Sequence, residues 1–250
     1  MLFITLLLAV SASAQKKPQP YNVFKGDTIN RTDAKGLKQG VWKKYYSNDS
    51  LFSMGQYKNG KPYGVFKTYY KTGEMEATLT YRNAPGIADM IIYHENGKRK
   101  ATGKYVNQKK DSVWTYFTTD GVLSSTETYM IGVEEGIWKS FYANGKVSRE
   151  ITYLKGKRNG PYKEYFDDGK TKVEANMKNY NYDGTVTMYY PNGKIWMQGK
   201  YINSVREGTW NVFDETGKKI REDKYKDGEL LNPPKEEEPK NKIPEPDSKK

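Results

Sequence analysis

The side chains that most often carry acid–base or nucleophilic chemistry are sparse in this chain of 250 residues. There is no cysteine and only one histidine, His94, so neither a thiolate nucleophile nor a cluster with zinc-ligand spacing can be built. The adjacent acids Glu134-Glu135 and Asp167-Asp168 occur in turn regions, and neighbours on a strand point to opposite faces. They make poor acid–base pairs. We therefore expect no enzyme activity, no catalytic residue, no cofactor and no metal site, and a surface or packing role for His94.

Basic and aromatic side chains are interleaved in three segments that could instead bind a ligand: WKKYY (42–46), FKTYY (66–70) and WKSFY (138–142). Such a pattern can hold single-stranded nucleic acid, and aromatic platforms also bind glycans. The formal net charge of +12 favours loose attraction to anionic surfaces. The export signal described below argues against nucleic acid, so glycan and anionic lipid remain as alternatives to a protein partner.

These segments belong to a pattern that repeats at a fixed interval. The stretch GVWKKYYSNDSL begins at Gly40, GIWKSFYANGKV at Gly136 and GTVTMYYPNGKI at Gly184. Successive copies start 24 residues apart, at 40, 64, 88, 112, 136, 160, 184 and 208. A constant period of this length is the signature of a repeat array in which each unit buries its apolar face against its neighbours. Residues 40–231 are therefore predicted to form eight repeats.

Aromatic residues occupy fixed columns of the repeat. With position 0 at Gly40, position 5 is aromatic in all eight copies, position 2 is most often Trp and position 17 is most often Tyr. Because side chains alternate along a strand, positions 2 and 6 should share one face and position 5 the other. Either a bulge shifts this register, or aromatic side chains cover both faces of a thin sheet. The predicted structural aromatic ladder consists of Trp42, Tyr45, Tyr69, Trp114, Trp138, Phe141, Tyr165, Tyr189 and Trp210.

A column of glycines marks the turn inside each repeat. Position 9 holds Gly73, Gly97, Gly121, Gly145, Gly169, Gly193 and Gly217, each preceded by Asn, Asp or Thr. Asn-Gly between aromatic-rich runs is a strong hairpin signal, so we predict a two-residue type I′ turn joining strands near positions 1–7 and 10–18. A second, looser turn is predicted between units, as in 58–64. Each unit is then a β-hairpin and the chain is all-β.

The ends of the chain differ from the array in composition. Residues 1–14 carry an apolar run that is too short to span a bilayer, which needs ~20 residues, and that ends in Ala12-Ser13-Ala14. This predicts a signal peptide cleaved between Ala14 and Gln15, although no Lys or Arg precedes the run. We expect an exported protein, periplasmic or secreted, with no transmembrane span in the mature chain. Residues 15–39 read as a linker and cap, and the Pro- and charge-rich residues 232–250 as a disordered tail.

The repeat unit G-x-W-x-x-Y-Y-x-N-G-K-(L/V/I), followed by G-x-Y-x-x-G, resembles the variant MORN repeat, most fully at 40–60, 136–156 and 184–201. The segment INRTDAKGLKQGVWKKYY (29–46) is similar to the start of exported bacterial members of this family, some of which are YwqK-type antitoxin components of toxin–immunity pairs. Repeats three and four depart from the pattern, because Ala88 and Ser112 replace the opening glycine and Met90 the tryptophan.

This resemblance implies an open single-layer antiparallel meander of stacked hairpins without catalytic residues. A closed ring of four-stranded blades is disfavoured, because no 48-residue alternation is visible in the sequence. We predict an exported, non-enzymatic scaffold that binds a macromolecular partner, most simply a protein, in the cell envelope. The alternatives are a toxin-neutralising immunity protein and a protein that binds cell-wall glycan or an anionic membrane surface.

Overall fold

The computed structural model describes residues 22–24, 27–82 and 86–233, and β-strand is the only extended regular structure in this part of the chain. The chain divides into two compact units, which share strand β10 (Lys109–Phe117). Unit 1 contains residues 1–111 and 116–121, and unit 2 contains residues 112–115 and 122–250. The predicted cleavage site at Ala14 and Gln15 lies outside the described residues, as does most of the predicted tail.

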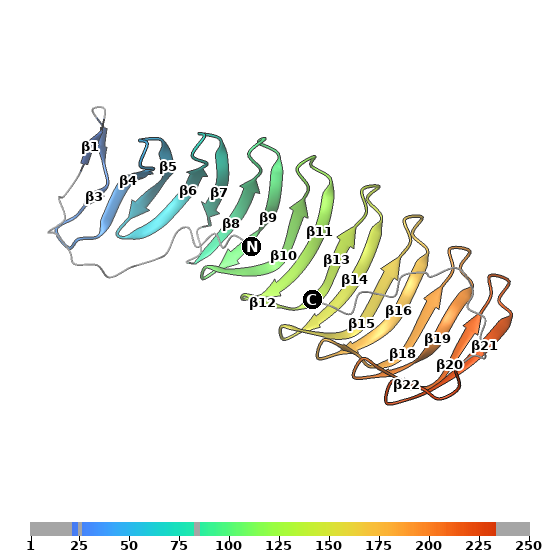
Figure 1. Ribbon diagram of the computed structural model, residues 1–250. Helices are drawn as coiled ribbons and strands as arrows, with labels where there is room; N and C mark the ends of the chain where they lie inside the picture. Colours follow the sequence, from blue (N-terminus) through green and yellow to red (C-terminus); the bar gives the residue numbers. More distant parts are fainter. Residues whose placement is uncertain (1–21, 25–26, 83–85, 234–250) are drawn as a thin grey trace. The chain divides into compact units, whose positions relative to one another are not determined.

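Unit 1 is an antiparallel meander that begins after a separate hairpin of β1 and β2. From β3 to β9 each strand pairs with the next strand in the sequence (Figure 1). The strands of unit 1 are β1 (Asn22–Phe24), β2 (Asp27–Ile29), β3 (Arg31–Thr32), β4 (Lys38–Tyr45), β5 (Leu51–Lys58), β6 (Lys61–Tyr69), β7 (Met75–Tyr81), β8 (Ile87–Tyr93) and β9 (Arg99–Val106).

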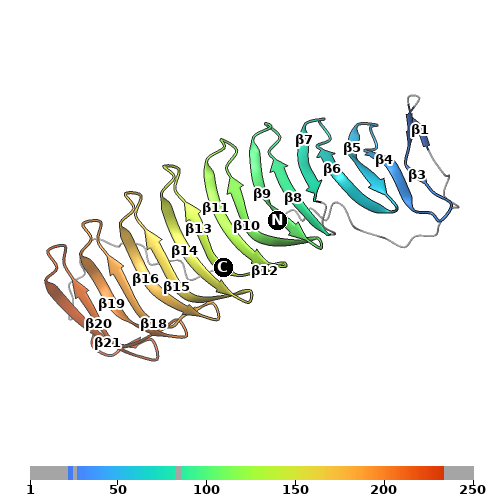
Figure 2. The same ribbon diagram turned by 180° about the vertical axis from the view of Figure 1, so that it is seen from behind.

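Unit 2 continues the same pattern of consecutive antiparallel pairs (Figure 2). Two of the first strands are each split into a short and a longer piece. As a result β11 pairs with both β12 and β13, and β16 pairs with both β17 and β18. The strands are β11 (Leu123–Met130), β12 (Val133–Glu134), β13 (Gly136–Phe141), β14 (Val147–Leu154), β15 (Lys157–Tyr165), β16 (Thr171–Lys178), β17 (Asn181–Tyr182), β18 (Gly184–Tyr189), β19 (Ile195–Ile202), β20 (Val205–Phe213), β21 (Lys219–Lys226) and β22 (Glu229–Leu230).

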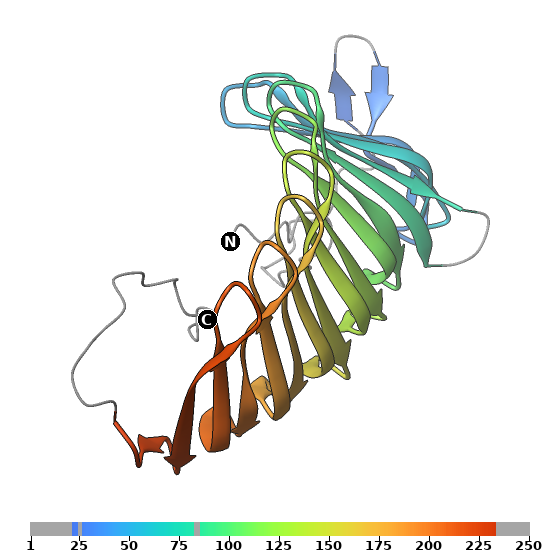
Figure 3. The ribbon, with the colours of Figure 1, turned by 90° about the vertical axis from the view of Figure 1, so that its right-hand side faces the viewer.

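These pairings confirm the predicted fold class, an all-β antiparallel meander built from one hairpin per 24 residues. The first strand of each hairpin ends at position 5; β4 and β20 begin before the opening glycine, whereas β13 and β18 begin at it. The second strand covers positions 11–18, as in β5 and β21. In unit 2 the hairpin loops follow one another in a row (Figure 3).

The predicted type I′ turn within each hairpin is wrong. The Gly145 N–H donates to the Tyr142 carbonyl at 2.9 Å, and the Tyr142 N–H donates to the Lys146 carbonyl at 2.8 Å. Gly145 has a φ of 81°, whereas Asn144 is not in the left-handed region. The loop therefore has three residues, a type I turn followed by a glycine bulge, and only its last residue needs a positive φ.

The two-residue type I′ turns lie between the repeats, where a looser connection was predicted. Lys58 pairs directly with Lys61, and the two residues between them, Asn59 and Gly60, have φ values of 52° and 74°. Two consecutive positive φ values are the mark of a type I′ turn. Both φ values are also positive at Asn107-Gln108, Ile131-Gly132, Lys155-Gly156, Asn179-Tyr180, Asn203-Ser204 and Asp227-Gly228.

The pairing register of the hairpins shifts near the end of the first strand. The register shifts between Lys44 and Tyr45 in β4, and between Val212 and Phe213 in β20. A bulge was one of two alternatives that the sequence left open, and it is present in seven of the hairpins. Below, the core face is the face that carries Trp210 and Val212, both buried, and the polar face is the opposite one.

A second irregularity at the opening glycine brings the position-2 aromatic over the preceding strand. Gln56 pairs with Tyr63 and Met54 with Lys67, so Gly55 faces three residues of β6, and the opening Gly64 has a φ of 68°. A Cβ atom at Gly55 would lie 2.1 Å from Cδ1 of Phe66. The ring therefore occupies the space that a side chain at Gly55 would need.

Candidate functional site

Aromatic side chains of positions 2 and 17 alternate in rows on the core face. In unit 1 the ring centroids of Trp42 and Tyr57 are 5.8 Å apart, those of Tyr57 and Phe66 5.2 Å, and those of Phe66 and Tyr81 5.3 Å, all edge to face. Edge-to-face contacts at this spacing stabilise beyond the burial of the rings. Burial also raises the pKa of Tyr81 to about 12. The rows thus form the core of a one-layer sheet.

A similar row of rings runs through the last repeats of unit 2, and it includes Tyr182, which stands two residues before the opening Gly184. The ring centroids of Tyr182 and Tyr201 are 5.6 Å apart, those of Tyr201 and Trp210 5.0 Å, and those of Trp210 and Tyr225 6.2 Å. The Trp210 side chain is fully buried. Three valines and three methionines complete this cluster, which also contains Ala175 and Tyr162.

The predicted aromatic ladder is divided between the two faces. Trp42, Trp138 and Trp210 belong to the core-face rows, and Trp114 is fully buried. The position-5 residues contact polar-face side chains instead or lie half-buried at strand ends. Their contacts are Tyr69 Oη to Met54 Sδ at 3.6 Å, Tyr165 Oη to Glu150 at 3.1 Å and Tyr189 Oη to Glu174 at 3.1 Å, while Tyr45 and Phe141 are half-buried.

Cations of the chain itself cover the rings at two places on the core face. The Lys38 ammonium lies 4.5 Å from the ring centroid of Trp42 and 4.7 Å from that of Tyr57. The Arg206 guanidinium lies 4.8 Å from the ring of Trp210. Burial lowers the pKa of Lys38, and the neighbouring Lys44 adds to this. Because these ring faces already hold an intramolecular cation–π partner, they are not free platforms for a sugar ring.

The polar face carries a repeated group of lysine, glutamate and tyrosine. Lys163 Nζ lies 2.9 Å from Glu174, which also accepts a hydrogen bond from Tyr189 at 3.1 Å. Lys139 Nζ lies 2.8 Å from Glu150 in the preceding repeat. The hydrogen bond from Lys163 is the main cause that lowers the pKa of Glu174. These groups satisfy one another and link neighbouring strands.

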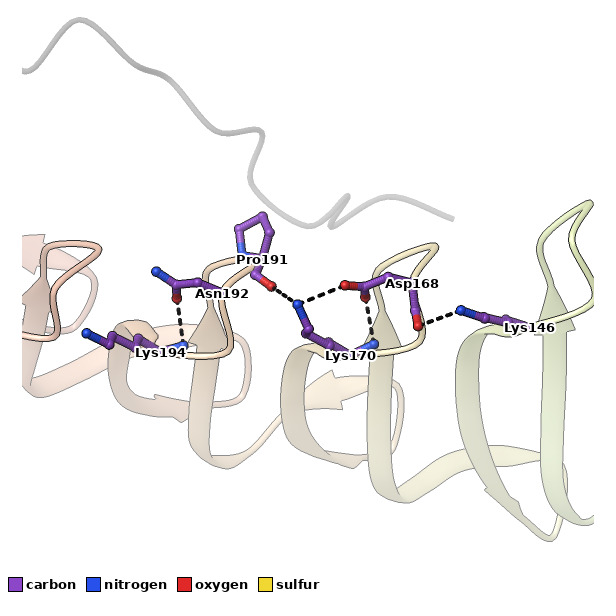
Figure 4. A network of polar contacts seen from close by, with 6 residues as sticks. All are labelled: Lys146, Asp168, Lys170, Pro191, Asn192 and Lys194. Atoms are coloured by element: carbon purple, nitrogen blue, oxygen red, sulfur yellow. Dashed lines mark hydrogen bonds and ion pairs between the residues drawn. The ribbon is translucent and has the colours of Figure 1, made fainter.

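The three-residue loops are joined to one another by side chains that reach the backbone of the next loop (Figure 4). Lys146 Nζ donates to the Asp168 carbonyl at 2.7 Å, and Lys170 Nζ donates to the Pro191 carbonyl at 2.8 Å. Lys170 also pairs with the Asp168 carboxylate at 3.0 Å. The hydrogen bond from the backbone N–H of Lys170 to the Asp168 carboxylate is the main cause of the lowered pKa of Asp168. The acid pair Asp167-Asp168 is therefore part of loop structure.

Position 6 makes a second set of such contacts. The Tyr46 hydroxyl donates to the Tyr69 carbonyl at 2.7 Å, and the hydroxyl of Tyr142 donates to the Tyr165 carbonyl at 2.6 Å. His94 stands in the same column, with Nε2 3.0 Å from the Phe117 carbonyl oxygen. The histidine thus has the packing role that its position in the repeat predicted.

The type I′ turns are linked in a similar way by the residue before the opening glycine. Glu135 accepts a hydrogen bond from the Lys155 N–H at 2.8 Å, and Glu207 accepts one from the Asp227 N–H at 3.0 Å. The carboxylate of Glu135 therefore satisfies the backbone of the adjacent turn. Among the described residues, no cluster of three His, Cys, Asp or Glu side chains is placed to hold a metal ion.

Large apolar side chains are exposed along the type I′ turns of unit 2. Met130 pairs with Val133 across one turn, and Ile202 pairs with Val205 across another. We call this surface the apolar edge; its residues are Met130, Ile131, Val133, Leu154, Tyr180, Ile202 and Val205, with exposed fractions from 41% to 63%. At the matching positions of the first inter-repeat turn, unit 1 has Lys58 and Lys61.

One residue of the apolar edge is also strained. Ile131 has a φ of 47° and its side chain is 49% exposed. A β-branched residue in the left-handed region is a rare outlier, and the other residues in this turn position are Asn, Asp or Lys. Lys155, Lys157 and Lys178 are exposed in the neighbouring turns. The apolar edge thus combines exposed apolar surface, a strained residue and nearby positive charge.

Sequence reasoning missed the apolar edge. Its signal was present in the columns after the position-17 aromatic, which read Lys-Asn-Gly-Lys at 58–61 but Met-Ile-Gly-Val at 130–133. Within the described ranges, no helix has the length and hydropathy needed to cross a membrane.

Comparisons with curated proteins and with solved structures give different results. No curated protein matches the chain. Among solved structures, the crystal structure of TarM is similar over 38% of this chain and 18% of that chain, with 18% sequence identity and a TM-score of 0.28. The chain therefore spans less than a fifth of TarM, and a likeness of this size supports no inference about function.

A family model described as MORN repeat variant matches six segments, 38–59, 62–83, 134–155, 158–179, 182–203 and 206–227. Together they make up more than half of the chain. The stretch between the second and third segments has no match, and it contains the departures at Ala88, Met90 and Ser112. The predicted resemblance is confirmed at this level, and the chain belongs to the MORN repeat variant family.

Proposed function

We propose that this protein is an exported, non-enzymatic repeat scaffold that binds a protein partner through the apolar edge of unit 2. The observation that carries the proposal is the exposure of Met130, Ile131 and Val133 in one type I′ turn, at 63%, 49% and 44%. Contiguous apolar patches on soluble proteins usually mark interaction sites. Strain at Ile131 supports the same view, because unfavourable backbone angles cluster at functional positions.

A protein partner fits this surface better than a glycan does. The ring faces of Trp42 and Trp210 are covered by Lys38 and Arg206, whereas aliphatic side chains such as Leu154 and Ile202 are exposed. Aliphatic side chains contribute to binding by burial in a protein interface. The exposed Lys155 and Lys157 would favour acidic side chains at the rim of the partner.

The test is a comparison of partner capture from envelope extract by the mature chain and by a variant whose turn copies that of unit 1. The variant carries Met130→Lys, Ile131→Asn and Val133→Lys. Because Asn59 already occupies this turn position with a φ of 52°, the fold should tolerate the change. We expect capture to fall at least ~10-fold, while Lys58→Ser with Lys61→Ser in unit 1 leaves it unchanged. Equal capture by both variants would refute the proposal.

The same variant distinguishes a protein partner from an anionic membrane surface and from cell-wall glycan. Its two added lysines strengthen attraction to anionic vesicles, so sedimentation that rises with the variant would favour a membrane surface. Retention on cell-wall glycan that is unaffected by the variant would favour glycan. The captured protein could also be a toxin domain. If cells that express this toxin grow only when they also express the chain with the wild-type apolar edge, the chain is an immunity protein of the YwqK type.

Export is the second part of the proposal and rests on the sequence of residues 1–15. The mature protein purified from its natural host is expected outside the cytoplasm with Gln15 as its first residue. Intact mass spectrometry decides this, because a chain that retains Met1 would contradict export through this segment.

A further inference from the structure

The first and last full strands of the repeats, β4 and β21, each have an outer edge that would pair with a further repeat. Unpaired strand edges are templates for association. In both places, a short segment beside the strand and one asparagine side chain cover this edge. The two coverings use the same chemistry, as the contacts below show.

At β4 the covering residues are 29–32. Arg31 pairs with Gln39 and Thr32 with Lys38, while the Asn30 N–H donates to the Val41 carbonyl at 2.9 Å. The Asn30 side chain then reaches Lys43. Its Oδ1 accepts from the Lys43 N–H at 2.8 Å, and its Nδ2 donates to the Lys43 carbonyl at 3.0 Å.

At β21 the covering residues are 229–232. Strand β22 pairs with Tyr225 and Lys226, and the Leu231 N–H donates to the Lys224 carbonyl at 2.7 Å. The Asn232 Oδ1 accepts from the Lys224 N–H at 2.6 Å, and its Nδ2 donates to the Glu222 carbonyl at 2.7 Å.

Each asparagine amide thus replaces two hydrogen bonds that a neighbouring strand would make. Asn232 stands 24 residues after Gly208, where a ninth repeat would place its opening glycine, and Pro233 follows it. Proline has no N–H to donate to a sheet. Within the described residues, regular strand pairing ends at this point, and a side chain covers the edge of the last full strand.

Inside the array, the second strand of one repeat pairs with the first strand of the next, as β5 with β6 and β19 with β20. The outer edge of β21 is the counterpart of the β19 edge that pairs with β20, and the outer edge of β4 is the counterpart of the β20 edge that pairs with β19. A second copy of this chain therefore offers, in its own β4, the matching partner for β21.

We propose that β21 and β4 are complementary docking edges for a second copy of this chain, and that Asn232 and Asn30 are the end clamps that keep them closed. Opening both clamps lets chains associate head to tail. Because this contact joins two different surfaces, it leaves one open edge at each end of the assembly, and chains add until the rotation between copies closes a ring or a filament grows.

The experiment uses the full mature chain with Asn30→Ala, Asn232→Ala, both substitutions, or neither. Sedimentation velocity over a range of concentrations measures the size of the particles. We expect the double variant to form oligomers that grow with concentration under conditions where the wild type does not. Asn176→Ala, in the middle of β16 and exposed, is the control and should behave as the wild type.

Mixing the single variants gives a sharper test, since each retains one clamp. The Asn30→Ala chain has only its β4 edge open, and the Asn232→Ala chain has only its β21 edge open. An equimolar mixture is expected to form a complex of twice the monomer mass, whereas each single variant alone keeps the wild-type size. Absence of a complex in the mixture, or self-association of one single variant to the same extent, would overturn the proposal even if the double variant failed to fold.

Discussion

His94 Nε2 lies 3.0 Å from the carbonyl oxygen of Phe117 and replaces a tyrosine in the row of bonds that links one repeat to the next. The hydroxyls of Tyr46 and Tyr70 make the equivalent bond at 2.7 Å to the carbonyls of Tyr69 and Tyr93. A carbonyl oxygen only accepts hydrogen bonds, so the proton of His94 must be on Nε2. The column requires a ring with a donor at its far end.

The first prediction follows from this requirement. His94→Tyr should keep the free energy of unfolding within about 0.5 kcal/mol of the wild type, whereas His94→Phe should lower it by about 1 kcal/mol through loss of one hydrogen bond. Urea unfolding followed by circular dichroism provides the measurement. Equal stability of the Tyr and Phe variants would show that the bond contributes nothing.

Phe166 provides the reciprocal test, because it occupies the same column without a donor. Phe166→Tyr places a hydroxyl where the other tyrosines reach the carbonyl of the next repeat, which here belongs to Tyr189. We expect an increase of about 0.5–1 kcal/mol in the free energy of unfolding. A decrease would mean that the loop of this repeat cannot accept the added hydroxyl.

The loop bulge predicts opposite effects at two equivalent positions. Asp49 has a φ of 63° in the column where the other repeats have glycine, such as Gly145 with a φ of 81°. Asp49→Gly should stabilise by up to about 1 kcal/mol, and Gly145→Ala should destabilise by about 1 kcal/mol. A Cβ atom at Gly145 would meet no heavy atom within 4 Å, so its cost reflects backbone conformation alone. Thermal unfolding of both variants shows whether each substitution raises or lowers the stability of the fold.

A third prediction concerns the contact of Trp210 with Gly199. A Cβ atom at Gly199 would lie 2.1 Å from Cδ2 of Trp210, and this glycine is not in the left-handed region. Gly199→Ala should therefore destabilise through overpacking, by up to about 3 kcal/mol. The chain already contains the smaller pair Ala175 and Val186 at the same two positions.

That smaller pair supplies the control. Trp210→Val alone leaves a cavity, but Gly199→Ala combined with Trp210→Val should cost less than the sum of the two single changes. A double-mutant cycle on unfolding free energies measures the coupling. Strict additivity would contradict direct contact between the two positions.

Alkaline pH should weaken unit 1 through Tyr81. Burial raises its pKa from 10.0 to about 12, which means that the fold favours the neutral phenol. Its contribution is fully present below the unfolded pKa and is lost as pH rises from 10.0 through about 12. The stability difference between wild type and Tyr81→Phe should therefore shift in favour of the variant at high pH. Urea unfolding at about pH 8 and about pH 11 compares the two chains, and a pH-independent difference would contradict the expected shift.

The period and the columns are sufficient to predict the hairpin meander, because each hairpin is built from local pairings. The turn types were not predictable in the same way. Asn-Gly occurs at both Asn59-Gly60 and Asn144-Gly145, yet one pair forms a two-residue turn and the other ends a three-residue loop. The difference depends on which residues pair across the strands, and the bulge beside Tyr45 sets that register.

The apolar edge and the end clamps were missed for different reasons. Met130 and Val133 lie in columns that a periodic pattern treats as turn, so their exposure depends on the true position of the turn. Asn30 and Asn232 lie outside the eight repeats, and nothing in the sequence marks an asparagine that pairs with an edge strand. Both features depend on register and on pairing partners, which a single sequence does not contain.

The loop contacts of Tyr142, Lys146 and Lys170 all end on a main-chain carbonyl of the following repeat. Each unit therefore recognises the backbone of its neighbour, which is the same whatever side chains that neighbour carries. A gene that gains or loses one whole unit of 24 codons would preserve every such bond, whereas a change of any other length would break the row. Array length can thus evolve in whole steps, and substitutions on the exposed surfaces can accumulate independently in each unit.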